Sequence, residues 1–167
     1  ALKSRMLLHP MKALSETLEK KYVLTNVHDS LYKTSIKMFS ENKVIGIGPK
    51  MYRKDCSNQK YVVDDKSCGS HPHNIYLQLL AETGIIGFGI FFIFIISFVF
   101  KTLLHFKNLI FKKKNYLSDF MVCIMASIFI NIWPIIPTGN FFNNWISIVY
   151  YLPLGFYFSS LGKQLDT

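Results

Sequence analysis

Two long stretches of this 167-residue chain contain no charged residue, and they constrain its fold more than any other feature. They cover residues 84–100 and 120–161. An α-helix needs about 20 predominantly apolar residues to cross the hydrocarbon core of a bilayer. A chain this apolar is not disordered, and its second half does not resemble an ordinary soluble domain. The pattern predicts an all-α polytopic membrane protein, with a helical loop region followed by three transmembrane helices.

The predicted spans and their connections follow from the positions of the charges. The spans are residues 85–104, 120–137 and 145–162. Basic side chains gather between the two charge-free stretches, namely Lys101, Lys107, Lys112, Lys113 and Lys114. Short loops rich in lysine face the cytoplasm. A cytoplasmic position accounts for five of the lysines that contribute to the net charge of +9, so nucleic-acid binding is not predicted.

The same rule assigns a side of the membrane to every connection. Residues 105–119 form a cytoplasmic basic loop, and residues 163–167 form a cytoplasmic tail. Residues 1–84 and the turn at residues 138–144 are then expected on the opposite side. The chain begins Ala-Leu-Lys-Ser-Arg, with neither an initiator methionine nor a signal peptide. We expect further spans upstream, and we expect these 167 residues alone to be inactive.

The three cysteines are too few for a disulfide scaffold. Cys123 lies within a predicted span, where a cysteine behaves as a small apolar residue. Cys56 and Cys68 lie in the polar half of the chain, 12 positions apart. If this half faces an oxidising compartment, they are expected to form a disulfide.

Helices and turns are also predicted in the polar half. The spacing of apolar residues predicts a helix over residues 29–41, followed by a tight turn at Gly46-Ile47-Gly48-Pro49. A second, short helix is expected around Pro72, capped by Ser70. Gly84 is expected to end or kink this helix where the first span begins.

Several polar side chains lie immediately before the first span. They are His71, His73, Asn74 and Glu82. Ionisable groups at that depth are costly unless they serve a site. We expect His73 and Asn74 in the first turn of the short helix, where the helix dipole disfavours an imidazolium. His73 would therefore stay neutral, as a proton acceptor must.

This segment resembles the signature of the O-antigen ligase and polymerase family, whose members are bacterial polytopic enzymes. The family pattern is His, then Asn, Ser or Gln, nine residues, Gly, two residues and Gly. Here His73, Asn74, residues 75–83, Gly84 and Gly87 fit the pattern without a gap. The helix before the Gly46–Pro49 turn and the closing Phe-Phe-Asn-Asn-Trp turn at residues 141–145 also look similar. The resemblance covers residues 25–162.

The resemblance implies a glycosyltransferase that works without a metal or cofactor on the periplasmic face of the bacterial inner membrane. The donor would be a glycan linked to undecaprenyl diphosphate. The acceptor would be a sugar hydroxyl, on lipid A-core for a ligase or on another repeat unit for a polymerase. A protein oligosaccharyltransferase with a related signature is a further alternative. His73 corresponds to the family's histidine, which would activate the hydroxyl or position the reacting groups, and Asn74 beside it is the second candidate catalytic residue.

The resemblance also implies arginines that neutralise the diphosphate leaving group. Many relatives have an arginine about four residues before an aromatic residue in the helix that precedes the signature, whereas this chain has His28 before Tyr32. Arg53 is the nearest arginine and our candidate for a phosphate contact. His28, His71 and Glu82 are the other candidates for binding the diphosphate or the substrate, and Gly84 and Gly87 are structural.

Each candidate also has a structural explanation, which the sequence leaves open. His73 is alternatively an interfacial residue bonded to a backbone carbonyl, and Asn74 a helix cap. His71 is alternatively a capping or packing residue, and Glu82 the partner of a lysine. His28 and Arg53 are alternatively surface residues.

A non-enzymatic transporter or flippase is the competing function from another class. Transporters place ionisable residues and helix breaks near the middle of the bilayer. In this chain the predicted spans contain few polar groups, with Asn131 and Pro134 in the second. The polar cluster lies instead at the outer rim of the first span, which favours chemistry at the membrane surface.

Overall fold

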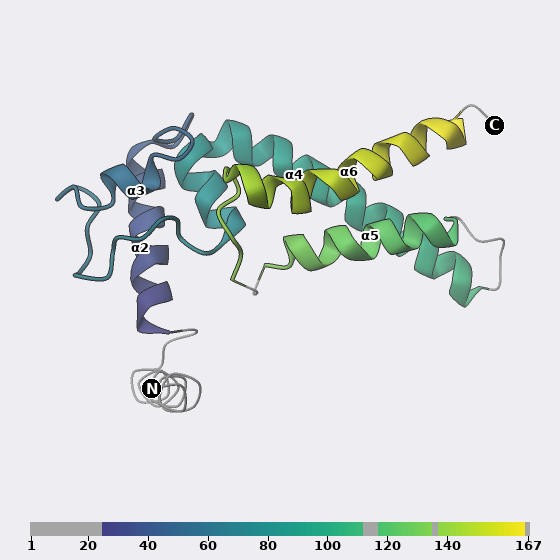
Figure 1. The fold of residues 1–167 in the computed structure, drawn as a ribbon, viewed down its shortest axis with the longest axis horizontal. Helices are drawn as coiled ribbons and strands as arrows, with labels where there is room; N and C mark the ends of the chain where they lie inside the picture. Colours follow the sequence, from purple (N-terminus) through teal and green to yellow (C-terminus); the bar gives the residue numbers. More distant parts are fainter. Residues whose placement is uncertain (1–24, 112–116, 135–136, 166–167) are drawn as a thin grey trace.

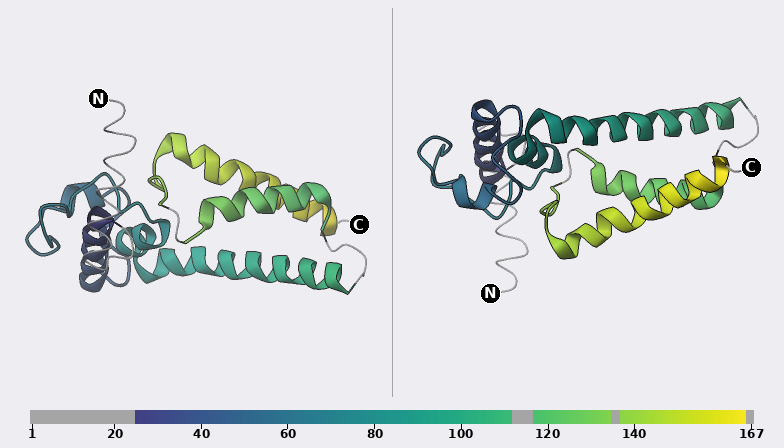
Figure 2. Two further views of the ribbon diagram at one scale, coloured as in Figure 1. Left: turned by 90° about the horizontal axis from the view of Figure 1, so that it is seen from below. Right: turned by 90° about the horizontal axis from the view of Figure 1, so that it is seen from above.

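The structure is a computed structural model that describes residues 25–111, 117–134 and 137–165 of the chain. This part is helical and has no strands. Its elements are α2 (Asn26–Glu41), α3 (Tyr52–Asp55), α4 (Ile75–Ile110), α5 (Asp119–Ile132) and α6 (Asn144–Leu165). Helices α2 and α3 lie at one end of an elongated molecule, and α4 to α6 extend away from them (Figure 1). The other views show α4 along one side of the α5–α6 pair (Figure 2).

Helix α4 is broken near its beginning, as the sequence predicts. Gly84 has φ 62° and ψ −164°, which is outside the helical region. The break frees the carbonyl groups of Ala81 and Glu82 and the N–H groups of Ile85 and Ile86 from their partners within the helix. In a segment that enters a membrane, such groups must find other partners within the protein.

The turn after α2 supplies those partners. The N–H groups of Ile47 and Gly48 donate to the carbonyls of Ala81 and Glu82, at 3.0 and 2.9 Å. In return, the N–H groups of Ile85 and Ile86 donate to the carbonyls of Lys43 and Val44, at 2.8 and 3.3 Å. These four hydrogen bonds satisfy the backbone groups that the break exposes.

Two glycines allow the two backbones to approach so closely. A Cβ atom at Gly46 would lie 2.5 Å from the carbonyl carbon of Glu82, and one at Gly84 would lie 2.4 Å from the carbonyl oxygen of Val44. Both glycines have positive φ, which other residues rarely adopt. We call this contact of Gly46 with Gly84 the glycine clasp. Gly87 is structural as well, because a Cβ there would overlap the side chain of Thr83.

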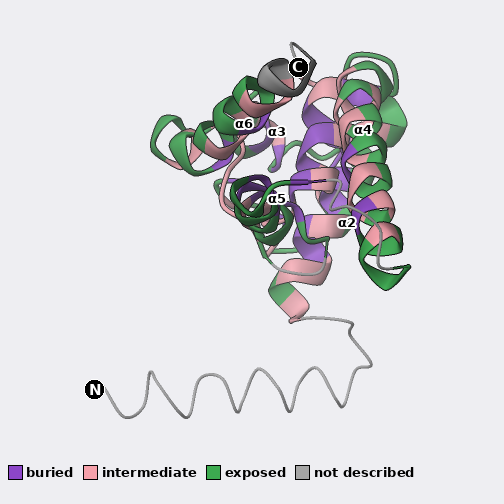
Figure 3. Cartoon of the chain, turned by 90° about the vertical axis from the view of Figure 1, so that its right-hand side faces the viewer, coloured by how far each residue is buried: buried purple, intermediate pink, exposed green. Residues whose placement is uncertain are grey.

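In the part of the chain that the structure describes, apolar side chains form three cores, the third of which lies around Ile75, Leu79 and Tyr150, where the start of α4 meets α6. The first joins α2, α3 and the start of α4, around Leu31, Met38 and Tyr52. The second joins α4, α5 and α6, around Phe98, Met121, Ile124, Met125, Ile128 and Tyr157. The outer surfaces of α4 and α6 are largely exposed, whereas buried residues face the interior (Figure 3). An apolar outer surface is what a helix in contact with lipid requires.

The helices do not end where the sequence predicts spans to end. Helix α4 continues beyond Leu104 to Ile110, and the described part of the chain has one helix long and apolar enough to cross a membrane, which is α4. Helix α5 is apolar but ends at Ile132 after 14 residues, because Pro134 disfavours helical backbone at Trp133. Helix α6 continues to Leu165. Three transmembrane helices therefore remain a proposal.

Some predicted elements lie outside the described residues. These are residues 1–24 of the predicted loop region, residues 112–116 of the basic loop, residues 135–136 of the second predicted span, and residues 166–167 of the tail. In the polar half, α2 begins at Asn26, earlier than expected, because Thr25 caps it. The segment after the glycine turn also contains the short helix α3.

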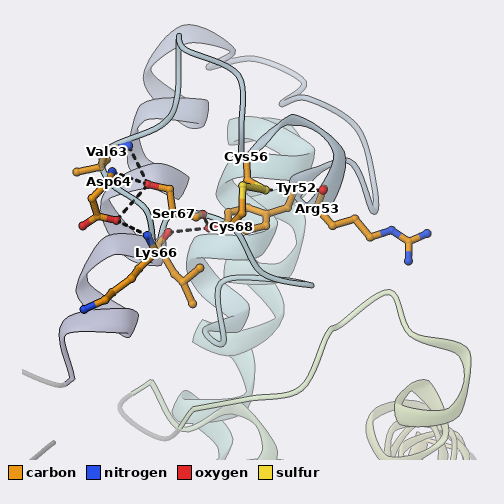
Figure 4. The surroundings of a disulfide bond; sticks show 9 residues. Tyr52, Arg53, Cys56, Val63, Asp64, Lys66, Ser67 and Cys68 are labelled. Carbon is orange, nitrogen blue, oxygen red and sulfur yellow. Dashed lines mark hydrogen bonds between the residues drawn. A yellow bond between two sulfur atoms is a disulfide. The ribbon is translucent and has the colours of Figure 1, made fainter.

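A disulfide joins Cys56, at the end of α3, to Cys68, the pairing that the sequence predicted for an oxidising compartment. The two Cα atoms are 5.1 Å apart. Inside the closed loop, the Ser67 hydroxyl accepts hydrogen bonds from the N–H groups of Val63 and Asp64, at 2.8 and 2.9 Å (Figure 4). The phenol of Tyr52 donates to the carbonyl of Ser67 at 3.0 Å. The disulfide thus ties an otherwise polar loop to the first core.

Removing the disulfide is expected to destabilise this end of the molecule. Closing a loop of this length stabilises a fold by about 3 kcal/mol in the chain-entropy model. The Cys56→Ser/Cys68→Ser variant in detergent should therefore unfold at a lower temperature than the unmodified protein. A reductant should lower the unfolding temperature of the unmodified protein but not that of the double variant. Equal unfolding temperatures with and without reductant would contradict this prediction.

Candidate functional site

The backbone of His73 has an unusual conformation. Its φ is 56°, in the left-handed region that histidine adopts more often than most residues but still rarely. The carbonyl of His73 accepts a hydrogen bond from the N–H of Thr138, in the loop between α5 and α6, at 2.9 Å. His73 precedes the cap of α4, so the prediction that it lies in the first helical turn was wrong. The tertiary hydrogen bond from Thr138 holds the backbone of His73.

Three histidine rings meet at this point. The centroids of the His71 and His73 rings are 4.1 Å apart, and those of the His28 and His73 rings are 5.6 Å apart. His28 comes from the first turn of α2, whereas His71 and His73 come from the loop before α4. We call His28, His71 and His73 the histidine cluster. The sequence singled out all three as candidates, and the structure brings them together.

Hydrogen bonds define the protonation of His71. Its Nε2 lies 3.0 Å from the carbonyl oxygen of Thr138, and its Nδ1 lies 2.8 Å from the hydroxyl of Ser70. Because a carbonyl can only accept, Nε2 carries the proton, and the neutral ring accepts at Nδ1 from Ser70. Burial lowers the pKa of His71, the bond to Thr138 raises it, and the nearby His73 lowers it further. His71 therefore packs as a fixed neutral ring against His73.

His28 is held in a similar way. Its Nδ1 lies 2.7 Å from the hydroxyl of Thr25, the residue that caps α2. Burial lowers the pKa of His28, and the proximity of His73 lowers it further. Both neighbours of His73 are consequently uncharged at neutral pH.

His73 itself keeps both ring nitrogens available. Within the described residues, no hydrogen bond reaches its imidazole, although His28 and His71 pack against it. The ring is partly exposed. A partly exposed imidazole with unengaged nitrogens is suited to accept a proton from a bound molecule.

Asn74 is the cap of α4, the structural alternative that the sequence left open. Its Oδ1 accepts from the N–H groups of Tyr76 and Leu77, both at 3.1 Å, and its Nδ2 donates to the carbonyl of Pro134 at 3.0 Å. Burial raises the pKa of the neighbouring Tyr32, and a hydrogen bond to Asn74 lowers it. These bonds fix the backbone of Asn74. Because His73 directly precedes Asn74, they also help to position His73.

Among the described residues, Glu82 forms no hydrogen bond with the histidines and no salt bridge with a lysine side chain, although the backbone of Lys50 bonds to it. Its side chain is fully buried, with Oε1 accepting from the N–H of Tyr52 at 2.9 Å and Oε2 accepting from Nε2 of Gln78 at 3.1 Å. Gln78 also donates to Oδ1 of Asn140 at 2.9 Å and accepts from the N–H of Phe141 at 3.0 Å. This buried network fastens α3 and the α5–α6 loop to α4, so Glu82 has a structural role in this part of the chain.

Arg53 is exposed on α3, and its side chain extends away from the disulfide into solvent (Figure 4). Within the described residues it makes no hydrogen bond, ion pair or ring contact with the histidine cluster. The nearby Lys50 has φ 63° and donates from Nζ to Oδ1 of Asn144, at the start of α6, at 3.4 Å. In the described part of the chain, neither cation therefore forms a hydrogen bond or ion pair with the histidine cluster.

The sequence predicted Ser70 only as a helix cap, a role that Asn74 takes instead, and it did not indicate the other residues that hold the site together. Ser70 and Thr138 orient the histidines, and Gln78 and Asn140 link α4 to the α5–α6 loop. A glutamine among apolar residues was the one available signal, since a buried amide requires partners. Among the described residues, no group of three or more His, Cys, Asp or Glu side chains is placed to hold a metal ion.

Acidification is expected to destabilise the histidine cluster. Because the pKa values of His28 and His71 in the folded protein lie below the ordinary 6.5, the unfolded chain binds more protons below that pH. Their contribution to stability is therefore complete above pH 6.5 and is lost as the pH falls through the folded values. The unfolding temperature in detergent should decrease from about pH 7.5 to about pH 5.

His71→Gln is the matched variant for this prediction, because an amide can still donate to Thr138 and accept from Ser70 but does not titrate. The unfolding temperature of His71→Gln should depend less on pH over the same range. An equal dependence in both proteins would mean that other groups cause it.

Comparison with known proteins gives one match. Residues 29–92 match the family model described as O-antigen ligase. This segment includes most of α2, the glycine clasp, His71, His73 and the first part of α4. The resemblance drawn from the signature is thus confirmed over residues 29–92. No curated protein and no solved structure matches the chain.

Proposed function

We propose, from the match to the O-antigen ligase family, that this chain is part of a membrane glycosyltransferase. It would transfer a glycan from undecaprenyl diphosphate to a sugar hydroxyl of lipid A-core, on the periplasmic face of the bacterial inner membrane. The observation that carries the proposal is the imidazole of His73, which has free nitrogens and lies at the start of the long apolar helix. That position is where a membrane-bound donor meets a water-soluble or headgroup acceptor.

In this proposal His73 acts as the proton acceptor. One of its ring nitrogens removes the proton from the acceptor hydroxyl, and the hydroxyl oxygen forms a bond to the anomeric carbon of the glycan. The bond from that carbon to the diphosphate breaks, and the undecaprenyl diphosphate leaves as an anion. His28 and His71 pack against the ring and keep its surroundings free of other positive charge at neutral pH. No metal or cofactor takes part in this scheme.

Binding of the donor would involve two further features. Lys50 and Arg53 are exposed cations beside the glycine turn, where they would neutralise phosphate groups. A cavity of about 350 Å³ between α4, α5 and α6 is lined by apolar side chains that include Ile75 and Leu79. Its composition suits an isoprenoid chain.

The orientation is supported by two independent features. A disulfide between Cys56 and Cys68 is typical of an oxidising compartment such as the periplasm. Lys101 and Lys107 lie toward the opposite end of α4, consistent with a cytoplasmic position. We propose the multi-pass topology with spans at residues 85–104, 120–137 and 145–162 on the same grounds.

An assay of the full-length protein in vesicles tests this function. A lipid-linked glycan is supplied as donor, together with lipid A-core, a second lipid-linked glycan or a polypeptide as acceptor, and the products are identified by mass spectrometry. Transfer to lipid A-core is expected. Chain lengthening would identify a polymerase instead, and a modified polypeptide a protein oligosaccharyltransferase. Transfer to none of them would refute the proposal and favour a non-enzymatic transporter.

A further inference from the structure

An exposed apolar tip lies beside the point where α4 begins its long apolar segment. The tip consists of Val44 and Ile45, which are 59% and 72% exposed. Ile85 and Ile86, directly after the break in α4, are 56% and 55% exposed. Such a contiguous apolar surface is unfavourable in water and normally marks an interaction site.

The position of the tip relative to α4 is determined by backbone hydrogen bonds. The carbonyls of Lys43 and Val44 accept from the N–H groups of Ile85 and Ile86, at 2.8 and 3.3 Å. The tip therefore lies at the level of the first residues of the proposed span. The glycine clasp holds the tip there, because Gly46 directly follows Ile45 and contacts the backbone of α4.

We propose that Val44 and Ile45 insert into the surface of the lipid bilayer, on the side of the histidine cluster, and act as a second membrane anchor beside α4. The lipid is the occupant indicated by the structure, because the tip continues the apolar outer surface of the helix that is long enough to span the membrane. Lys43 and Lys50 are exposed on either side of the tip. Lysines in these positions suit the headgroup region above inserted apolar side chains.

The anchor has a consequence for the position of the site. A helix can slide and tilt in the bilayer within limits set by its flanking residues. An apolar tip bonded to the same helix fixes the depth of the break at Gly84, and with it the depth of the segment from His73 to Glu82. This inference depends on α4 crossing the membrane and is independent of the proposed glycosyl transfer.

Fluorescence quenching tests the proposal. Ile45→Cys is introduced into the full-length protein carrying Cys123→Ser, labelled with an environment-sensitive fluorophore, and reconstituted in vesicles of phosphatidylcholine and phosphatidylglycerol. Lipids with a nitroxide near the headgroup should quench it several-fold more than they quench the same label at Val63→Cys. Val63 is a matched control, because it is also exposed and apolar but lies in the disulfide-closed loop (Figure 4).

Three results are distinguishable. Strong quenching by lipid nitroxide with weak quenching by aqueous iodide supports insertion. Quenching by iodide as strong as at Val63→Cys would show that the tip lies in water, and weak quenching by both agents would show that protein covers it; either result overturns the proposal. Val44→Cys provides a second labelling position if Ile45→Cys fails to fold, as judged by retention of the Cys56–Cys68 disulfide.

Discussion

Replacing His73 with alanine in the full-length protein is expected to abolish measurable glycan transfer while leaving the protein in the membrane. A positioned proton acceptor contributes about 10²- to 10⁴-fold to a reaction rate, and within the described residues His73 is the member of the histidine cluster whose ring has no hydrogen bond. Transfer from the lipid-linked donor, measured by gel mobility of the product, should fall by at least that factor.

His73→Asn separates a chemical role from a conformational one. Asparagine tolerates the left-handed backbone that His73 adopts, so this variant should keep the turn before α4. It lacks a basic nitrogen, and we therefore expect it to be as inactive as His73→Ala but closer to the unmodified protein in unfolding temperature. Substantial activity in His73→Asn would show that the residue serves the turn and not proton transfer.

Replacing Gly84 with alanine is expected to be the most destabilising single substitution in the described part of the chain. The conformation at φ 62° and ψ −164° is essentially restricted to glycine, and forcing another residue into it costs about 1–3 kcal/mol. The new methyl group would in addition lie 2.4 Å from the carbonyl oxygen of Val44. Relieving that overlap separates the turn from α4 and breaks the hydrogen bonds that satisfy the backbone at the break. The unfolding temperature and the amount of protein in the membrane should both fall.

Gly89→Ala is the matched control, because it makes the same chemical change on the same helix. No atom lies within 4 Å of a Cβ added at Gly89, and alanine favours helix over glycine by about 1 kcal/mol. Gly89→Ala should therefore unfold at or above the temperature of the unmodified protein. If Gly84→Ala and Gly89→Ala unfold at the same temperature, the glycine clasp does not stabilise the fold as we describe.

The residues of the signature could be located from the sequence because their relationships are local. The spacing from His73 to Gly87 places a histidine, a cap and a helix break in order along one segment, and long-range contacts do not alter that order. The same holds for the apolar character of α4. The end of α5 was less predictable, because it depends on how the backbone at Trp133 adapts to Pro134.

The amino-acid sequence by itself determined the apolar helices, the break at Gly84 and which three histidines are candidates for the site. The tertiary structure alone decided that His28 lies against His73, that Glu82 binds the backbone of Tyr52, and that Gly46 meets Gly84. The physical reason is that helix periodicity and glycine conformation act within a few residues. Partners 30 or more positions apart, in contrast, meet only in the folded chain, as where the turn after α2 satisfies the backbone groups that the break in α4 exposes.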